Sequence, residues 1–354
     1  MRCTRLVIAL ALMASVPAIQ LAGQSSSPRP KPANTRAIPR TADGRPDLQG
    51  MWTNVTITRL ERPAEFGTKA MVSNAEAAVY EKEYLKSNDK DRRDGGSRAD
   101  VERAYNGFFW DYGTELAVVN GQKRTSLIVD PADGKIPALT PDAQKRIPGP
   151  RPAWGSAVVG PDDPENAPPF GLYENPEERP LAERCLLAFG SSSGPPMLPV
   201  AYNNHYQIVQ ASGYVTILVE MVHDARIIPT DGRAHGNIRR WLGDSVGRWE
   251  GDTLVVDTIN FKPQVNFRGS SENLHVIERF TRTDANTILY TFTIDDPTTW
   301  TRKWTGEIPL RATDERLYEY ACHEANYGLE GVLRGARAQE KREAETSPDK
   351  KKQF

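Results

Sequence analysis

The stretch of sequence that decides the fold is HYQIVQASGYVTILVEMVHDAR, residues 205–226. Two runs of alternating apolar and polar residues flank Ser-Gly at 212–213, a two-residue turn typical of β-hairpins. Counting back from this turn places His205 opposite Glu220 on neighbouring strands. The alternation gives the hairpin one apolar face, which we predict to be core: Tyr206, Ile208, Val215, Ile217, Val219 and Met221.

Strand-like runs rich in valine, isoleucine, threonine and aromatic residues continue to residue 322. The predicted strands are 202–210, 214–222, 248–249, 253–259, 274–281, 287–294, 303–310 and 317–322. Because several connecting turns are short, neighbouring strands should run antiparallel, and closing the sheet would remove its exposed edges. We therefore predict a mainly β fold, an antiparallel meander that closes into a barrel of approximately eight strands. A loop-rich N-terminal extension with one or two helices and a C-terminal helix complete it.

Composition limits the class of protein. The 354 residues include 45 Lys plus Arg and 46 Asp plus Glu, a net charge of -1, and 38% of the residues are hydrophobic. These values are typical of a soluble globular protein, and a charge near zero argues against nucleic-acid binding. Since no stretch reaches about 18 consecutive apolar residues, we expect no membrane span.

The N-terminus indicates the compartment. Arg2 and Arg5 precede an apolar run over 6–16 and small residues over 18–23, which is the order of a cleaved secretory signal. Because no cysteine follows the small residues, we expect no lipid anchor and predict a periplasmic or secreted protein. The predicted organisation is a signal peptide over 1–23, a disordered leader over 24–43, the N-terminal extension packed on the barrel over 44–200, the barrel over 201–326, and the C-terminal helix and polar tail over 327–354.

Two features mark the N-terminal extension. Ser73 and Glu76 form a capping box that predicts a helix over about 73–86. The segment 148–199 holds 12 of the 27 prolines, so neither a helix nor a central strand can run through it. A segment of this length is either a covering element or a linker. Its aromatic residues favour an ordered cover that could form a wall or lid of a pocket.

Only two cysteines follow the signal peptide, Cys185 and Cys322. In an oxidising compartment an isolated pair most simply forms one disulfide, which would tie the proline-rich segment to the last predicted strand. Two buried thiols, or a reactive Cys322 beside His323, are the alternatives.

The densest group of reactive side chains lies over 220–226. Glu220, His223 and Asp224 supply acid and base groups, and Arg226 supplies a fixed fork for an anion or a carbonyl oxygen. We assign His223 as the acid/base, Glu220 or Asp224 as its orienting or second acid/base group, and Arg226 as the anchor. The alternative is structural, with Asp224 and Arg226 in an ion pair and His223 donating to a carbonyl.

Other polar residues are candidates for a ligand cavity. Glu278 and Glu319 stand at core-like positions, where a carboxylate must be paired or must face water; a bulge that turns either one outward is the alternative. Their available partners are Arg226, Arg268, Arg279 and Arg302. The predicted ligand-binding set is Tyr202, Asn204, His205, Arg268, Glu278 and His323. The His205–Glu220 pair is either a solvated surface pair or part of a cavity lining.

Common motifs of cofactor and metal chemistry do not occur in the sequence. There is no Walker, GxGxxG or CxxC string, and none of the five histidines has HxH or HExxH spacing. We therefore predict no metal and no cofactor.

Several strings resemble a large family of exported bacterial proteins of unknown function. They are DGRPDLQGMW at 43–52, RTSLIVDPADG at 124–134, HDARIIPTDG at 223–232, GRWEGDTLVVDT at 247–258 and VIERF at 276–280. The resemblance covers nearly all of the chain after the predicted signal peptide and implies no catalytic residue. The hairpin at 249–252 is also loosely similar to strand pairs of lipocalin-type calycin barrels, which implies a fold alone.

These observations predict an exported protein with a pocket for a small-molecule ligand or substrate. The leading hypothesis is an acid/base hydrolase, lyase or isomerase that acts without a metal on a polar, carbohydrate-like substrate. The alternatives are a lipocalin-like barrel that binds an apolar ligand without catalysis, and a structural or cell-surface interaction protein. Three or more ionisable groups converging on the cavity would favour the enzyme, and an aromatic, uncharged pocket would favour the carrier.

Overall fold

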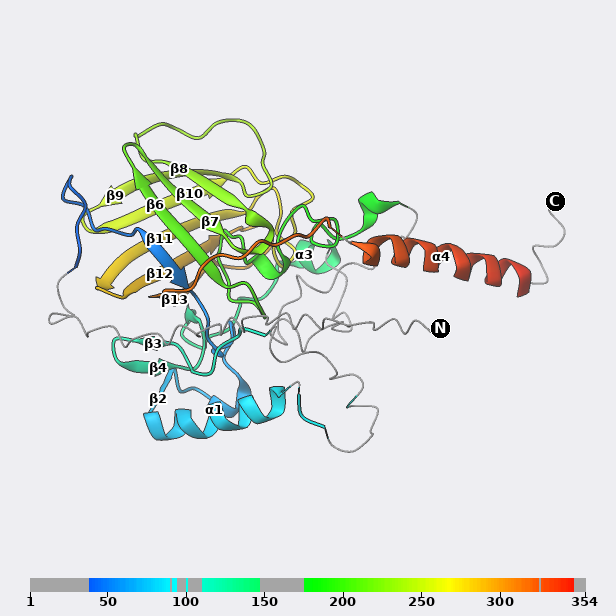
Figure 1. The fold of residues 1–354 in the computed structure, drawn as a ribbon, viewed down its shortest axis with the longest axis horizontal. Helices are drawn as coiled ribbons and strands as arrows, with labels where there is room; N and C mark the ends of the chain where they lie inside the picture. The colour runs from blue at the N-terminus through cyan, green and yellow to red at the C-terminus, as the bar shows by residue number, and fades with distance from the viewer. Residues whose placement is uncertain are drawn as a thin grey trace, which may run out of the picture. The chain divides into compact units, whose positions relative to one another are not determined.

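The structure is a computed structural model that describes residues 38–89, 91–93, 100, 110–146, 175–324 and 326–346. Its main feature is one antiparallel sheet, whose strand order is β8-β7-β6-β1-β13-β12-β11-β10-β9, with β5 pairing beside β13 (Figure 1). The strands are β1 (Gly50–Thr53), β5 (Ile128–Asp130), β6 (His205–Ala211), β7 (Tyr214–Val219), β8 (Ala225–Pro229), β9 (Asp244–Glu250), β10 (Thr253–Ile259), β11 (His275–Asp284), β12 (Thr287–Asp295) and β13 (Trp304–Ala312).

The sheet curls until its two edge strands meet. A Cβ added to Gly247 in β9 would lie 2.9 Å from Ile228 Cγ2 in β8, so the two edges are in close contact without a ladder of backbone hydrogen bonds. This confirms the predicted antiparallel meander that closes, nearly completely, into a barrel. The shape is compatible with a calycin-like fold.

The hairpin that begins the meander has the predicted register. Ala211 pairs with Tyr214 and Tyr206 pairs with Val219. The Glu220 backbone N–H donates to the His205 carbonyl at 3.0 Å, which continues the ladder by one pair. All six side chains of the predicted core face are buried.

The barrel takes strands from both halves of the chain. β1 lies between β6 and β13, and its Trp52 is buried in the common core. The predicted strand over 317–322 was wrong: this segment has no regular secondary structure, and Tyr318 is 70% exposed. The reason is that both sides of β13 are already paired, by β12 on one side and by β1 and β5 on the other.

The described helices agree with the sequence. α1 (Asn74–Asn88) begins at the predicted capping box, in which Ser73 Oγ accepts from the Glu76 N–H at 3.2 Å and Glu76 Oε2 accepts from the Ser73 N–H at 2.9 Å. A second, three-stranded sheet lies next to α1. Its strand order is β2 (Met71–Val72), β4 (Gln122–Arg124) and β3 (Val118–Val119). α3 (Pro141–Arg146) and the C-terminal α4 (Tyr327–Thr346) complete the set. The predicted signal peptide lies outside the described residues.

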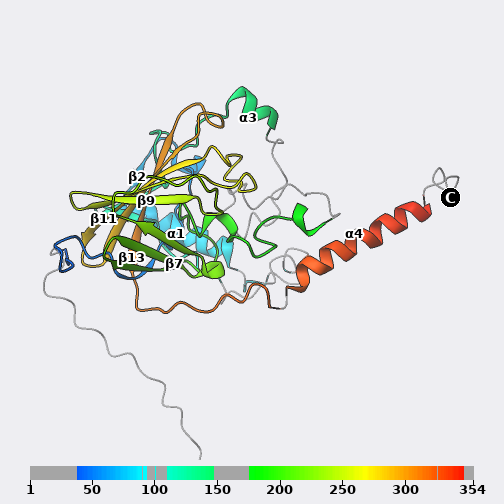
Figure 2. The same cartoon turned by 90° about the horizontal axis from the view of Figure 1, so that it is seen from above.

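The two ends of the barrel differ in their connections. At one end, tight turns at 212–213, 251–252 and 285–286 join neighbouring strands. At the other end, where β6, β8, β9, β11 and β13 begin, the connections are longer, and the segment 175–204 leads into β6 (Figure 2). We call this second end the capped end. The predicted candidate residues at the starts of β6, β8 and β11 therefore lie toward it.

Candidate functional site

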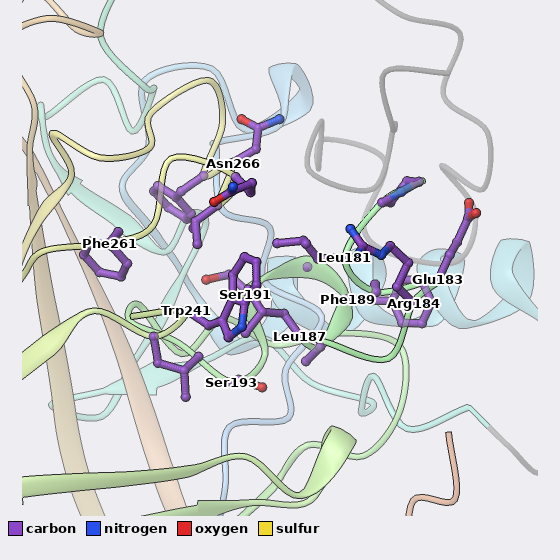
Figure 3. Close-up of a pocket in the computed structure, with 18 of the residues that line it drawn as sticks. Leu181, Glu183, Arg184, Leu187, Phe189, Ser191, Ser193, Trp241, Phe261 and Asn266 are labelled. Atoms are coloured by element: carbon purple, nitrogen blue, oxygen red, sulfur yellow. The ribbon is translucent and has the colours of Figure 1, made fainter. Parts of the chain in front are cut away.

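A pocket of about 320 Å³ lies at the capped end. One wall is the segment 177–195, and the facing wall comes from residues 241–242, 261–267 and Leu274. Figure 3 shows side chains of both walls around the same space. The apolar lining includes Leu181, Leu187, Phe189, Trp241, Leu242, Phe261, Val265, Phe267 and Leu274, and the uncharged polar lining includes Ser191, Ser193, Gln264 and Asn266. The charged lining residues are Glu177, Glu178, Arg179, Glu183 and Arg184.

Local contacts hold the wall 177–195 in its fold. Arg179 and Glu183 form a two-pronged ion pair, with Nε–Oε2 at 3.0 Å and Nη2–Oε1 at 3.1 Å. The Leu186 N–H donates to the Leu181 carbonyl, and the predicted disulfide between Cys185 and Cys322 is present. The described part of the proline-rich segment is therefore an ordered wall of the pocket, whereas residues 147–174 lie outside the described residues.

The predicted carboxylate at a core-like position, Glu278, lies inside the barrel. Its fully buried carboxylate binds both terminal nitrogens of Arg226, one of them at 2.9 Å, and accepts from the Tyr290 hydroxyl at 2.8 Å. The Tyr290 hydroxyl in turn accepts from the Met197 N–H at 2.9 Å. The barrel interior is therefore partly polar, as the sequence indicated, but these groups bind one another. Neither Arg226 nor Glu278 lines the described pocket.

His205 lies between two carboxylates. Its Nδ1 is 3.0 Å from Glu220 Oε2, and its Nε2 is 3.2 Å from Glu315 Oε2. The hydrogen bond with Glu220 raises the pKa of His205 above its ordinary value, although burial opposes the shift. Burial would raise the pKa of Glu220, yet the hydrogen bonds from His205 and from the Tyr318 N–H bring it below its ordinary value. The pair is thus a buried ion pair at the capped end.

Asp111 is a member of the same charged group that the sequence did not reveal. Burial raises its pKa to about 6, with smaller effects from His205, Glu315 and Glu220. Its Oδ2 is buried and has no hydrogen-bond partner among the described residues. No periodic pattern surrounds this residue in the sequence, so only the fold could bring it to His205.

The remaining predicted catalytic residues separate. His223 is exposed, and its Nε2 accepts from the Tyr320 N–H at 2.8 Å. Asp224 is half-buried, and its Oδ2 accepts from the hydroxyl of Ser193, a pocket-lining residue, at 2.5 Å. Burial raises the pKa of Asp224 above its ordinary value. Among the described residues, Asp224 is the one predicted catalytic residue that forms a hydrogen bond with a residue of the pocket lining.

The other predicted ligand-binding residues take structural positions. Asn204 is buried, and its side-chain amide donates to the carbonyls of Asp111 and Val200. Tyr202 packs with Phe189 against a small apolar cluster. His323 and Glu319 are exposed. Glu319 is therefore not at a core position, because the strand that would have buried it does not form.

A second charged network lies on the outer face of β9, β10 and β11. His235 binds Asp244 through Nδ1 at 3.2 Å and Asp257 through Nε2 at 3.0 Å. His275 Nε2 lies 3.1 Å from the same Asp257. The hydrogen bond with Asp257 raises the pKa of His275. Within the described ranges, no group of three or more His, Cys, Asp or Glu residues is arranged to hold a metal ion.

Comparison with known proteins gives no relative. No protein-family model, no curated protein and no solved structure matches the chain. The resemblance to an exported bacterial family stays a prediction. No helix among the described residues is both long and apolar enough to cross a membrane.

Proposed function

We propose that the protein binds a small, mainly apolar molecule in the pocket at the capped end of the barrel. The observation that supports this is the lining, in which aliphatic and aromatic side chains outnumber the charged ones. Small-molecule sites usually have this composition, and about 320 Å³ is within their usual size. The Arg179–Glu183 ion pair offsets two of the charges on the rim.

A lining in which apolar side chains outnumber the five charged ones favours a carrier over the acid/base enzyme that led the sequence hypotheses. Glu220 and Arg226 are bound to His205 and Glu278, and His223 binds backbone. A charged substrate would meet none of these groups in the described pocket. The charged lining residues that it would meet all belong to the wall 177–195. The facing wall offers amides, Gln264 and Asn266, which orient a ligand without requiring it to be charged.

The test is a pocket-filling substitution with a matched surface control. Leu187→Trp adds an indole to the pocket, whereas Ile227→Trp adds the same group to an exposed position on β8, where Ile227 is 63% exposed. The probe is anilinonaphthalene sulfonate, an amphipathic dye whose fluorescence rises in apolar sites. We expect Leu187→Trp to weaken dye binding at least tenfold and Ile227→Trp to leave it unchanged. Equal binding by both variants would reject the pocket as the site.

Acid/base chemistry at the same pocket is a second candidate, favoured by the Ser193–Asp224 hydrogen bond. A half-buried carboxylate whose pKa is raised can take a proton from, or return it to, a group held beside it. Asp224→Asn should then abolish turnover of a hydrolysable substrate while the dye still binds. If turnover survives this substitution, Asp224 is not the acid/base group. If the wild-type protein binds the dye but turns over no substrate, the protein is a carrier.

We also propose that the protein is exported, to the periplasm or the medium. The disulfide supports this, because disulfides persist in oxidising compartments. Expression with the complete N-terminus in a bacterial host, followed by N-terminal sequencing of the extracytoplasmic protein, tests it. A new N-terminus near residue 24 is expected, and retention of Met1 in the cytoplasmic fraction would contradict the proposal.

A further inference from the structure

The segment 313–324, which we call the strap, joins β13 to α4 without regular secondary structure (Figure 1). None of its residues is buried. A segment that buries so little side chain depends on individual polar contacts for its position, and such segments open at low cost in free energy. The contacts that hold the strap therefore decide how often it opens.

At its C-terminal end the strap is fixed to the pocket wall. Cys322 is joined to Cys185, which lies in the wall 177–195. Just beyond the strap, Asn326 donates to the carbonyl of Glu183, a pocket-lining residue, at 2.9 Å. Tyr320 packs in the same apolar cluster as Phe189, another lining residue. The strap and this wall of the pocket are thus mechanically coupled.

Along its length the strap is held to the barrel by two histidines. Glu315 binds His205 Nε2 at 3.2 Å, and the Tyr318 N–H donates to Glu220 at 3.3 Å. The Tyr320 N–H donates to His223 Nε2 at 2.8 Å, a contact that needs this nitrogen unprotonated. His205, by contrast, forms its ion pair with Glu315 only as an imidazolium, because the neutral ring carries no charge and its one N–H can stay with Glu220.

We infer that the strap is a latch on the outer wall of the ligand pocket, and that the His205–Glu315 ion pair is the contact that releases it. This inference rests on the proposed ligand pocket. When His205 loses its proton, its one remaining N–H stays with the buried Glu220. The exposed Glu315 then loses its partner, and fewer contacts hold the strap, because the hydrogen bonds from Tyr318 to Glu220 and from Tyr320 to His223 remain. The strap therefore opens more often, and the wall attached through Cys322 can move with it.

The direction of the pH dependence follows from the charges around His205. The groups that face it are Glu220 from the end of β7, Glu315 from the strap and Asp111, and all three favour the imidazolium when ionised. Its pKa is raised, so the latch is fastened below the ordinary histidine value and is released as the pH rises through the raised value. The Tyr320 N–H donates to His223, so this contact of the strap does not depend on the charge of His205.

The experiment measures how fast the dye leaves the pocket in stopped-flow displacement between pH 6.5 and 9. Glu315→Gln removes the strap's charge, and Glu319→Gln, an exposed strap glutamate with none of these contacts, is the matched control. An exposed ion pair is worth at most about a fivefold change in rate. We therefore expect Glu315→Gln to speed dye release about two- to fivefold at pH 6.5, and wild-type release to approach the variant's rate at pH 9.

A second measurement does not depend on the pocket. Hydrogen exchange of a peptide that spans Tyr318 and Tyr320 should be faster in Glu315→Gln than in Glu319→Gln at the same pH. If Leu187→Trp leaves dye binding intact, the proposed pocket is wrong, whatever the strap does. If Leu187→Trp blocks binding but Glu315→Gln changes neither release nor exchange, the pocket stands and the latch is rejected.

Discussion

Replacing one partner of the buried Arg226–Glu278 ion pair should destabilise the protein far more than replacing both partners. Arg226→Met would leave the fully buried Glu278 carboxylate with the Tyr290 hydroxyl as its donor. Breaking a buried pair in this way typically costs about 3–5 kcal/mol, because an uncompensated charge remains in a medium of low polarity. Glu278→Leu should cost a similar amount by leaving the guanidinium unpaired. Replacing both by apolar residues of similar volume should cost less than about 2 kcal/mol.

The assay is urea unfolding of the disulfide-intact protein, with the two single variants and the double variant forming a cycle. At a slope of about 2–3 kcal/mol per molar urea, each single variant should lower the midpoint by about 1–2.5 M without changing the slope. Arg279→Met is the control, because Arg279 binds Glu250 at 2.8 Å on the exposed surface, where ion pairs are worth about 0–1 kcal/mol. A double variant as unstable as the sum of the two singles would refute the reasoning.

Three other predictions follow from separate parts of the structure. Gly306→Ala should lower stability by about 1–3 kcal/mol in the same unfolding assay, because the new Cβ would lie 2.3 Å from Phe292 Cζ in the packed interior; an unchanged midpoint would contradict the tight packing. Asp257 raises the pKa of His275, so His275→Gln should be most destabilising below the ordinary histidine pKa and less so as the pH rises through the raised pKa. Its effect on the melting temperature should therefore shrink between pH 6 and 9. Titration of the denatured, unreduced protein without its proposed signal peptide, and so without Cys3, should find no free thiol. Cys322→Ser should cost about 2–5 kcal/mol, and two titratable thiols would reject the disulfide.

The sequence predicted the barrel because its signals there are local. Alternation around the turn at 212–213 specifies the hairpin and its register, and therefore the cross-strand pair of His205 and Glu220. The capping box at Ser73 likewise specifies the start of α1 from four residues. β1 carries no comparable signal: four residues with one buried side chain are too short to show a period, and only the vacant edge beside β6 and β13 makes them a strand.

The candidate site was harder to predict because its members come from distant segments. Side-chain alternation predicted that Glu278 points into the barrel, and the sequence offered four arginines as partners. The curl of the sheet determines that Arg226 is the one that pairs with it. His223 lies four residues after β7 ends, where Val222 and His223 both have positive φ, so alternation no longer fixes its direction. Asp111 and the facing wall at 261–267 lie in loops whose positions depend on the whole fold.

The place of β1 in the barrel has a consequence for how the chain acquires its structure. β1 is synthesised first among the barrel strands, yet its two neighbours are β6 and β13, and β13 ends at Ala312, about 260 residues later. At about 5–20 residues per second, some 10–50 seconds pass between the synthesis of β1 and that of its last partner. Until then the edge of β1 that pairs with β13 is unpaired, and the core around the Trp52 side chain is incomplete. Folding of this barrel therefore waits for nearly the whole chain, and contacts between residues so far apart in sequence favour slow closure.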